Sequence, residues 1–273
     1  MIEGRPSVTA LRAATYRAQH QLFDQPLVFD DPLAVRILAP TGPMKAPRFA
    51  ALRAFAAARS RFAEDQLVLA RAHGCSQYAI IGAGLDTFAY RNSDTDLRVF
   101  EIDHPATQAW KRALVAQAGI AVPQGVAYVP VDLAREPLTP ALLDAGLDAS
   151  APTFFSWLGV TPYLDEAAVL ETLAAIHALH PGNRIVFDYL LSARALGLKG
   201  RMALRVIEWY VARLGEPLRS GFTPEDIRSR LQAIGFRGVE NYDSPALNVL
   251  YFDHRSDGLR IPGRMAHFVS ASA

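Results

Sequence analysis

Residues 78–103 constrain the fold more than any other part of the chain. The stretch begins with an apolar, partly β-branched run at residues 78–81, which ends at Gly82, Ala83 and Gly84. A buried strand that ends in a glycine-rich bend has this pattern, and glycine is needed there because φ is positive and a ligand approaches the backbone closely. A second apolar run, residues 97–102, ends at Asp103. An acid in that position can accept both hydroxyls of a ribose lying on the glycine loop, so the stretch predicts a site for a nucleoside-bearing cofactor.

The rest of the sequence alternates between apolar runs and amphipathic segments. We expect further strands at residues 126–131, 153–158, 184–189, 239–243 and 267–271, with a long polar connection between the last two. We expect helices at residues 8–22, 33–38, 49–73, 105–118, 141–147, 166–179, 196–214 and 227–234. Strands that alternate with helices form a mostly parallel sheet covered on both faces. The sequence therefore predicts an α/β fold around a seven-stranded, mostly parallel sheet.

The helices that precede the first strand have clear start signals. Ser7 is a predicted N-cap, and Asp31 is a second one because proline follows it at the first helical position. A break is expected at residues 40–47. Residues 2–5 resemble a protease cleavage site and carry no weight in these predictions.

The longest predicted helix, residues 49–73, places an arginine among its apolar residues. On a helical wheel centred on Phe55, the apolar arc includes Leu52, Leu69 and Arg59, whereas Arg53 lies outside it. A buried arginine needs a partner because an unpaired buried charge is costly. Arg59 is therefore expected either to extend its charged end to solvent or pair with a structural acid, or to face a bound carboxylate.

Composition excludes several classes of partner. The chain has 28 basic and 27 acidic residues in 273, without a basic run interleaved with aromatics, so we expect no nucleic acid to bind. No stretch approaches the roughly 20 apolar residues of a membrane span, and we expect no membrane partner. Cys75 is the one cysteine, so no intramolecular disulfide can form, which suits a reducing cytoplasm.

Several chemistry-bearing residues follow predicted strands. The glycine loop follows the first strand, Asp103 the second, Asp132 and Leu133 the third, and residues 157–163 mark the end of the fourth. Ligands of parallel α/β sheets bind beyond the carboxyl ends of the strands. We therefore expect these features to converge at one edge of the sheet.

The loop favours S-adenosylmethionine over a dinucleotide. A dinucleotide fingerprint would have a third glycine where this chain has Thr87, and Asp86 would repel a pyrophosphate. No lysine stands four residues after a tyrosine, as hydride chemistry would require, and no metal-binding pattern occurs. S-adenosylmethionine has no phosphates. Its amino-acid end suits glycine-loop amides and a guanidinium, its ribose suits Asp103, and its adenine suits Asp132 with Leu133 against the ring.

A set of short motifs makes the chain resemble the leucine carboxyl methyltransferase family, in particular its bacterial small-molecule branch. The resemblance implies a Rossmann-like class I methyltransferase fold with a helical N-terminal cap at residues 1–76, a cofactor-binding domain at residues 77–273 and a cap insertion at about residues 192–220. The motifs run in family order and are Thr9-Ala10, Arg17-Ala18, Asp31-Pro32-Leu33-Ala34, Ala58-Arg59-Ser60-Arg61-Phe62, residues 82–87, Tyr90-Arg91, residues 100–105, Val131-Asp132-Leu133, Trp157-Leu158-Gly159-Val160, Tyr163-Leu164 and Val186-Phe187-Asp188-Tyr189.

The same resemblance implies roles for individual residues. Arg59 would hold the cofactor carboxylate, Gly82 and Gly84 the methionyl backbone with Ala83 between them, Asp103 the ribose, and Asp132 with Leu133 the adenine. One position departs from the family, because Leu158 stands where eukaryotic members have a glutamate that contacts the cofactor. A backbone carbonyl of the glycine loop or of residues 156–158 would then accept the ammonium hydrogen bond.

Methyl transfer from a sulfonium is an in-line displacement, which mainly requires alignment. A small-molecule carboxylate is already ionised at pH 7 and needs no general base, whereas a phenol or alcohol does. His20, His104 and His177 are candidates for such a base, and Tyr163 is a candidate for orienting the acceptor. Trp209 and Tyr210 either line an apolar acceptor pocket or belong to the core.

The leading prediction is an O-methyltransferase that acts on a small molecule, with carboxyl esterification ahead of phenol methylation. Two other classes stay open at this level. One is an oxidoreductase of the NAD type, and the other is a non-catalytic module that binds S-adenosylmethionine, which Leu158 makes conceivable. Oligomeric state is not predicted.

Overall fold

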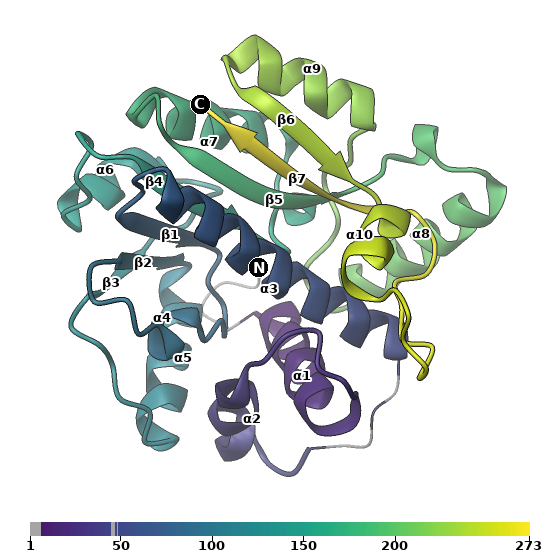
Figure 1. Cartoon of the computed structure of the whole chain (residues 1–273). Helices are drawn as coiled ribbons and strands as arrows, with labels where there is room; N and C mark the ends of the chain where they lie inside the picture. The colour runs from purple at the N-terminus through teal and green to yellow at the C-terminus, as the bar shows by residue number, and fades with distance from the viewer. Residues whose placement is uncertain (1–6, 45–46, 48) are drawn as a thin grey trace.

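The computed structural model describes residues 7–44, 47 and 49–273, and it is organised around one seven-stranded sheet (Figure 1). The strand order is β3-β2-β1-β4-β5-β7-β6, and β7 runs antiparallel to both of its neighbours. The strands are β1 (Gln77–Ile81), β2 (Arg98–Asp103), β3 (Val126–Pro130), β4 (Thr153–Trp157), β5 (Arg184–Leu190), β6 (Arg237–Tyr242) and β7 (Ala266–Ser272). The predicted seven-stranded, mostly parallel α/β sheet is confirmed.

The strand register brings the carboxyl ends of the central strands together. Ile81, the last residue of β1, is the register partner of both Ile102 in β2 and Trp157 in β4. Asp103 is in turn the register partner of Pro130 in β3. The loops that follow these strands therefore begin side by side at one edge of the sheet.

Helices cover both faces of the sheet (Figure 1). The helices are α1 (Val8–Phe23), α2 (Pro32–Leu38), α3 (Ala50–Ala72), α4 (Phe88–Arg91), α5 (Pro105–Gln117), α6 (Leu138–Asp144), α7 (Glu166–Leu179), α8 (Leu198–Ala212), α9 (Pro224–Ile234) and α10 (Ser244–Tyr251). Short 3-10 turns lie at Ala39–Thr41, Thr161–Tyr163 and Ala193–Ala195.

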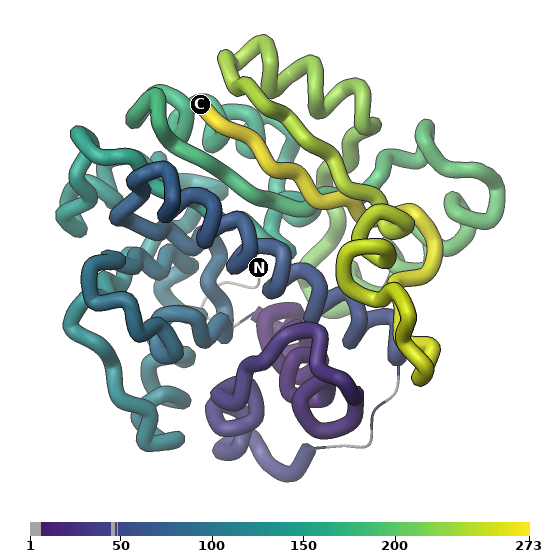
Figure 2. The backbone as a smooth tube through the Cα atoms, viewed as in Figure 1, coloured from purple at the N-terminus to yellow at the C-terminus, as the bar shows by residue number. Residues whose placement is uncertain are grey.

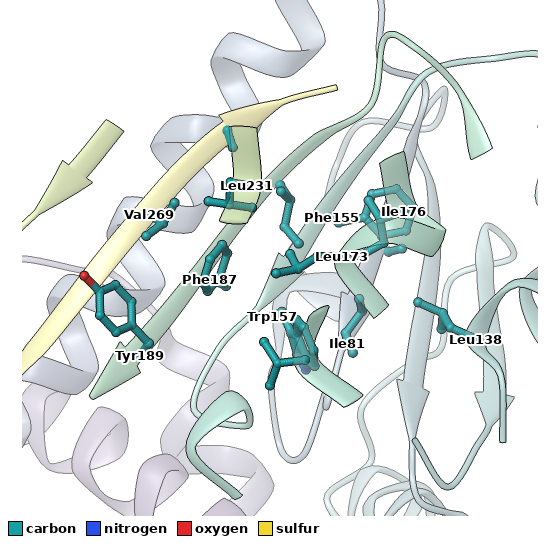
Figure 3. Packing of buried hydrophobic residues seen from close by; sticks show 14 of the residues in the cluster. Ile81, Leu138, Phe155, Trp157, Leu173, Ile176, Phe187, Tyr189, Leu231 and Val269 are labelled. Atoms are coloured by element: carbon teal, nitrogen blue, oxygen red, sulfur yellow. The ribbon is translucent and has the colours of Figure 1, made fainter. Parts of the chain in front are cut away.

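Alternate residues of each strand pack on opposite faces, as the pleat of a strand requires. Ile81 and Trp157 belong to a core shared with α6, α7 and α9, in which Leu173 and Leu231 are fully buried (Figure 3). Tyr78 and its neighbours on the other face belong to a second core, formed with α3, α4 and α10. The sheet is thus the middle layer of three.

The N-terminal helices form a third, smaller core against α5. Ala14 and Ala18 of α1 pack with Ile37 of α2 and Leu114 of α5. Both predicted caps are confirmed, since the Ser7 hydroxyl accepts the Ala10 amide at 3.1 Å and the Asp31 carboxylate accepts the Ala34 amide at 3.1 Å. Figure 2 shows this N-terminal part folded against the end of α3.

Helix α3 buries a different set of residues from the predicted apolar arc. Leu52 and Leu69 were expected to be buried but are exposed, whereas Arg53, expected to be outside the arc, is buried. The guanidinium of Arg53 donates two hydrogen bonds to Asp24, at 2.8 and 3.0 Å. The prediction was wrong because α3 contacts both the sheet and α1, so a single apolar arc does not describe its contacts.

Two other segments differ from the expectations. Helix α6 begins and ends three residues earlier than predicted, at Leu138–Asp144. The connection expected to be polar contains α10, whose N-cap Asp243 accepts the Ala246 amide at 3.0 Å. Residues 2–5 and part of the expected break at residues 40–47 lie outside the described residues. Within the described ranges, each helix is too short or too polar to cross a bilayer.

Candidate cofactor and acceptor site

The glycine loop after β1 is a tight bend that only small residues can form. Gly82 and Gly84 have φ angles of 68° and 49°, in the left-handed region that favours glycine. A Cβ atom on Gly82 would clash with the side chain of Val160, which follows β4. The first glycine therefore provides both the backbone conformation and the space in which two strand-end loops approach each other.

Asp103, at the end of β2, is bound to the glycine loop by a direct hydrogen bond. Its carboxylate accepts the Gly84 amide at 2.5 Å and the His104 amide at 2.7 Å. Burial raises the pKa of Asp103, and these two amides oppose the increase. Each carboxylate oxygen has a second lone pair that a ligand hydroxyl can use. The Gly84 amide, by contrast, is directed at Asp103 and is not open to a ligand.

Asp132 and Leu133 follow β3 beside this acid. The Asp132 carboxylate accepts the Ala134 amide at 3.1 Å and lies 3.8 Å from the Arg135 guanidinium, and it is partly exposed. Leu133 packs on the core that contains Trp157. The expected acid and apolar side chain therefore follow the strand that pairs with β2, and the Val131 amide donates to the Asp103 carbonyl at 2.9 Å.

Arg59 of α3 is held by an acid at the end of β5. Its guanidinium lies 3.6 Å from the carboxylate of Asp188, which also accepts the Gly159 amide at 2.5 Å. Burial raises the pKa of Asp188, and the nearby positive charge of Arg59 opposes that increase. The structure thus shows Arg59 paired with a structural acid, and this pair does not test the predicted contact with a bound carboxylate. Asp188 was part of the Val186–Tyr189 motif but received no predicted role, although an acid in an otherwise apolar strand was a usable signal.

Leu158 and Tyr163 lie on the turn after β4. Leu158 is half-buried and packs on the core between the sheet and α3. Tyr163 is half-buried, interacts with the Thr9 side chain of α1, and lies within electrostatic range of Arg59. Burial raises the pKa of the Tyr163 phenol, so this hydroxyl stays protonated at neutral pH and can donate a hydrogen bond.

The first turn of α1 lies over the glycine loop. A Cβ atom on Gly84 would come within 3.1 Å of the Ala10 methyl group. Glu216, in the segment after α8, accepts the amides of Val8 and Thr9 at 3.2 and 3.1 Å. The role of Glu216 was not predicted from the sequence. Residues near Glu216 give no sign that it accepts hydrogen bonds from the start of α1, about 200 residues earlier in the chain.

The three histidine candidates are not equivalent. The Nε2 atom of His20 accepts the amides of Val28 and Phe29, so its Nδ1 carries the proton and donates to Asp24 at 3.0 Å. His177 packs edge-on against Phe236 on the α7–α9 side. His104 alone of the three adjoins the site, directly after Asp103, where its Nδ1 accepts the Ala106 amide at 3.2 Å.

These residues fit S-adenosylmethionine. Gly82 and Gly84 carry no side chains that would separate a ligand from the backbone of the loop. Asp103 and Asp132 supply two separate acceptors at neighbouring strand ends, as a ribose and an exocyclic amine require. In the part of the chain that the structure describes, His, Cys, Asp and Glu side chains do not gather in groups of three suited to a metal ion.

The strand order and the antiparallel β7, with acids at the end of β2 and after β3, fit the fold of class I methyltransferases. Two solved structures share the fold. A provisionally named methyltransferase of Thermobifida fusca matches 99% of this chain and 96% of its own, with a TM-score of 0.61 and 20% identity. Magnesium protoporphyrin IX methyltransferase from Synechocystis, solved with bound SAH, matches 96% of this chain and 98% of its own, with a TM-score of 0.52 and 11% identity.

The chain belongs to the leucine carboxyl methyltransferase family, whose model matches residues 10–177. YktD of Bacillus subtilis, provisionally named an S-adenosyl-L-methionine-dependent methyltransferase, is 31% identical over 95% of this chain and 95% of its own. The protein is therefore an S-adenosylmethionine-dependent methyltransferase. The predictions of family and cofactor are confirmed, and the oxidoreductase alternative is set aside.

Proposed function

We propose that this protein methylates an oxygen atom of a small molecule and that the acceptor group is a carboxylate. The observation that carries the proposal is the place of Tyr163, a half-buried hydroxyl on the turn after β4 within electrostatic range of Arg59. A neutral phenol donates a hydrogen bond but cannot remove a proton at neutral pH. The surroundings of Tyr163 therefore suit an acceptor that is already ionised.

We propose the following roles in holding the cofactor. Asp103 accepts the ribose hydroxyls on the lone pairs that Gly84 and His104 leave open. Asp132 accepts the adenine amino group, with Leu133 against the ring. The bend at Gly82, with Ala83 after it, makes room for the methionyl end.

At that methionyl end, Arg59 binds the cofactor carboxylate while Asp188 fixes the direction of its guanidinium. Leu158 contributes an apolar wall, so backbone carbonyls accept the ammonium hydrogen bonds. Together with the strand-end acids, these contacts would hold both ends of the cofactor across the sheet edge.

The bound cofactor supplies an electrophilic methyl group on a sulfonium. The chain contributes alignment, because in-line displacement needs the attacking oxygen on the methyl axis. The Tyr163 hydroxyl donates to one acceptor oxygen and leaves the other oxygen to attack. The first turn of α1, held by Glu216, covers the glycine loop and keeps water away from the reacting groups. We propose that residues 1–76 form this cap.

We also propose that the protein is located in the reducing cytoplasm, which suits the buried, unpaired thiol of Cys75.

Methylation of a phenol or alcohol is the second candidate, and His104 is the observation that favours it. Its ring adjoins Asp103, and its Nδ1 is held by the Ala106 amide. In the neutral ring, the nitrogen that lacks a proton is the Nδ1 that accepts the Ala106 amide, so His104 can take a proton only by giving up that hydrogen bond. Such an acceptor would have to reach the His104 ring rather than the Tyr163 hydroxyl.

A transfer assay with methyl-labelled cofactor separates the two candidates. The purified protein is incubated with a panel of apolar carboxylic acids and a matched panel of phenols, and the products are treated with mild base. The proposal expects label that mild base releases as methanol, because esters hydrolyse and aryl ethers do not. Base-stable label, confined to the phenol panel, would contradict the carboxylate assignment.

A further inference from the structure

Helix α8 presents an apolar stripe to the outside of the protein. Four of its side chains are each more than half exposed: Leu198 at 76%, Met202 at 61%, Val206 at 66% and Trp209 at 57%. Their spacing of three and four residues places them on one side of the helix. Soluble surfaces rarely leave such a row of large apolar side chains on one helix exposed without a partner.

The opposite side of α8 is anchored in the protein. Leu204 and Val211 are buried at 7% and 8% exposure, and Leu204 belongs to the core around Trp157. Tyr210 stacks on the guanidinium of Arg12 in α1, with 4.7 Å between the guanidinium carbon and the ring centroid. The helix is therefore anchored through Leu204 and Val211, and its apolar stripe lies on the opposite, exposed side.

Positive charge surrounds this stripe. Lys199, Arg201, Arg205 and Arg213 lie on or directly after α8, against the single acid Glu208. The whole chain has a formal net charge of only +1, so this helix is far more basic than the rest. All four basic residues are exposed. A basic amphipathic helix with an aromatic residue in its apolar face is typical of helices that lie in a lipid interface.

A second copy of the chain fits this surface less well than lipid does. A stable protein interface buries about 800 Å² on each partner, whereas α8 offers one face of a helix about 22 Å long. Two copies that met stripe to stripe would also bring their basic flanks together. An anionic lipid surface accepts the apolar stripe in its acyl region and the basic side chains among its head groups.

We infer that α8 is an interfacial helix that docks the protein on an anionic lipid surface. This inference replaces the expectation of no membrane partner, which rested only on the lack of a membrane-spanning stretch. Leu198, Met202, Val206 and Trp209 enter the head-group boundary, and the flanking basic side chains bind lipid phosphates. The guanidinium of Arg213 lies 4.0 Å from the Trp209 ring, so these two side chains reach the interface as a unit. Docking leaves the helix in the plane of the surface, and it does not depend on which acceptor the enzyme methylates.

Co-sedimentation of the full chain with large vesicles tests this inference. Vesicles of phosphatidylcholine alone are compared with vesicles containing 30% phosphatidylglycerol, at low salt and at 0.5 M salt. We expect binding to the anionic vesicles that high salt weakens, with a blue shift of tryptophan emission. The shift should vanish in Trp209→Phe, because Trp157 is buried and Trp110 is only partly exposed.

Matched variants distinguish docking by α8 from non-specific adsorption of the protein to vesicles. Val206→Glu places a charge in the stripe, and Val68→Glu places the same charge on α3 at an equally exposed valine, 67% against 66%. We expect Val206→Glu to lower vesicle partitioning at least about tenfold and Val68→Glu to leave it nearly unchanged. Arg205→Glu reverses one exposed charge and should weaken partitioning by about thirtyfold. Thermal unfolding of each variant confirms that it is folded.

Four results would overturn the inference. The first is a wild-type chain that stays in the supernatant with both kinds of vesicle. The second is equal binding to neutral and anionic vesicles. The third is an equal loss of binding in the Val206→Glu and Val68→Glu variants. The fourth is a dimer in sedimentation velocity that Val206→Glu dissociates, because a second copy would then occupy the stripe. None of these results would bear on methyl transfer, which is measured separately.

Discussion

Gly84 donates its backbone amide to the carboxylate of Asp103 at 2.5 Å, so the loop after β1 and the end of β2 form one hydrogen-bonded unit. The same carboxylate accepts the amide of His104 at 2.7 Å. Two amide donors hold the side chain in one orientation without using all of its lone pairs. Asp103 is therefore positioned by the protein before any ligand reaches it.

Asp103→Asn should weaken binding of S-adenosylhomocysteine. The amide oxygen can keep one backbone hydrogen bond, but the amide nitrogen cannot accept a ribose hydroxyl, so the expected loss is about 1–3 kcal/mol. Titration calorimetry measures the affinity. The melting temperature without ligand serves as the control, because the Gly84 and His104 amides also depend on this carboxylate. Unchanged affinity would remove Asp103 from the site.

Gly82→Ala should destabilise the fold as well as the site. The new methyl group would clash with Val160, and alanine at a φ of 68° is strained. We expect a loss of about 1–3 kcal/mol in the free energy of unfolding, measured in urea. Adding Val160→Ala to this variant should restore the stability lost to the steric clash. The stability lost to backbone strain at position 82 should remain lost. A single variant as stable as the wild type would show that the two loops are not packed as described.

Arg59→Met should distinguish the two ends of the cofactor. Loss of the guanidinium should weaken S-adenosylhomocysteine about tenfold to a hundredfold, because hydrogen bonds to charged groups contribute about 1.5–3 kcal/mol. 5′-Methylthioadenosine lacks the amino-acid end, and its affinity should not change. The double variant Arg59→Met with Asp188→Asn serves as a control, because Arg59→Met alone leaves the Asp188 carboxylate without its ion-pair partner. If both ligands lost affinity equally, Arg59 would act on the shape of the pocket and not on a carboxylate.

Tyr163→Phe should impair use of the acceptor and spare the cofactor. The variant removes one neutral hydrogen-bond donor, so kcat/KM for a carboxylic acid acceptor should fall about threefold to tenfold. Burial raises the pKa of the phenol, so the wild type should show no loss of activity from its ionisation near neutral pH. Steady-state kinetics measures the first effect. A variant with weakened S-adenosylhomocysteine binding and unchanged acceptor kinetics would reverse the assignment.

Acidification should loosen the N-terminal helices through His20. Burial lowers the pKa of this histidine, with Arg255 and Arg53 acting in the same direction and Asp24 opposing them. The unfolded chain then binds a proton below its ordinary pKa of about 6.5 while the folded chain does not, so stability is complete above that pH and falls below it.

Urea unfolding at pH 7 and pH 5.5 checks this pH dependence. The contribution of one such group is at most about 1.4 kcal/mol per pH unit. His20→Gln retains a donor for Asp24 and an acceptor for the Val28 amide but has no proton to gain. Its stability should therefore fall less than that of the wild type. Equal falls in both proteins would assign the effect to other groups, such as His267, whose pKa burial also lowers.

The sequence predicts those features whose cause is local. Strand β1, the glycine bend and Asp103 were predicted because apolar runs, glycines and strand-end acids are adjacent in the chain. Helix α10 was missed although Asp243, followed by Ser244 and Pro245, is the same kind of helix start as Asp31 with Pro32. Its eight residues were too few to show a clear period within a polar connection.

Long-range pairs could not be predicted in the same way. Arg53 was assigned to the solvent side of its helix because its partner, Asp24, is 29 residues away. Arg59 left two alternatives open for the same reason, and the structure shows the pair with Asp188. The identity of a buried ion pair depends on which elements the fold brings together. A helical wheel contains no information about that.

The contact between Glu216 and the first turn of α1 joins two parts of the chain that are 208 residues apart. The amides of Val8 and Thr9 donate hydrogen bonds to Glu216, a residue that the ribosome adds only after β5 and α8. During synthesis the strands β1 to β5 and their strand-end acids can assemble while the N-terminal helix still lacks its acceptor. The strand ends should therefore come together first, and the first turn of α1 should be fixed beside the glycine loop only when residue 216 has left the exit tunnel.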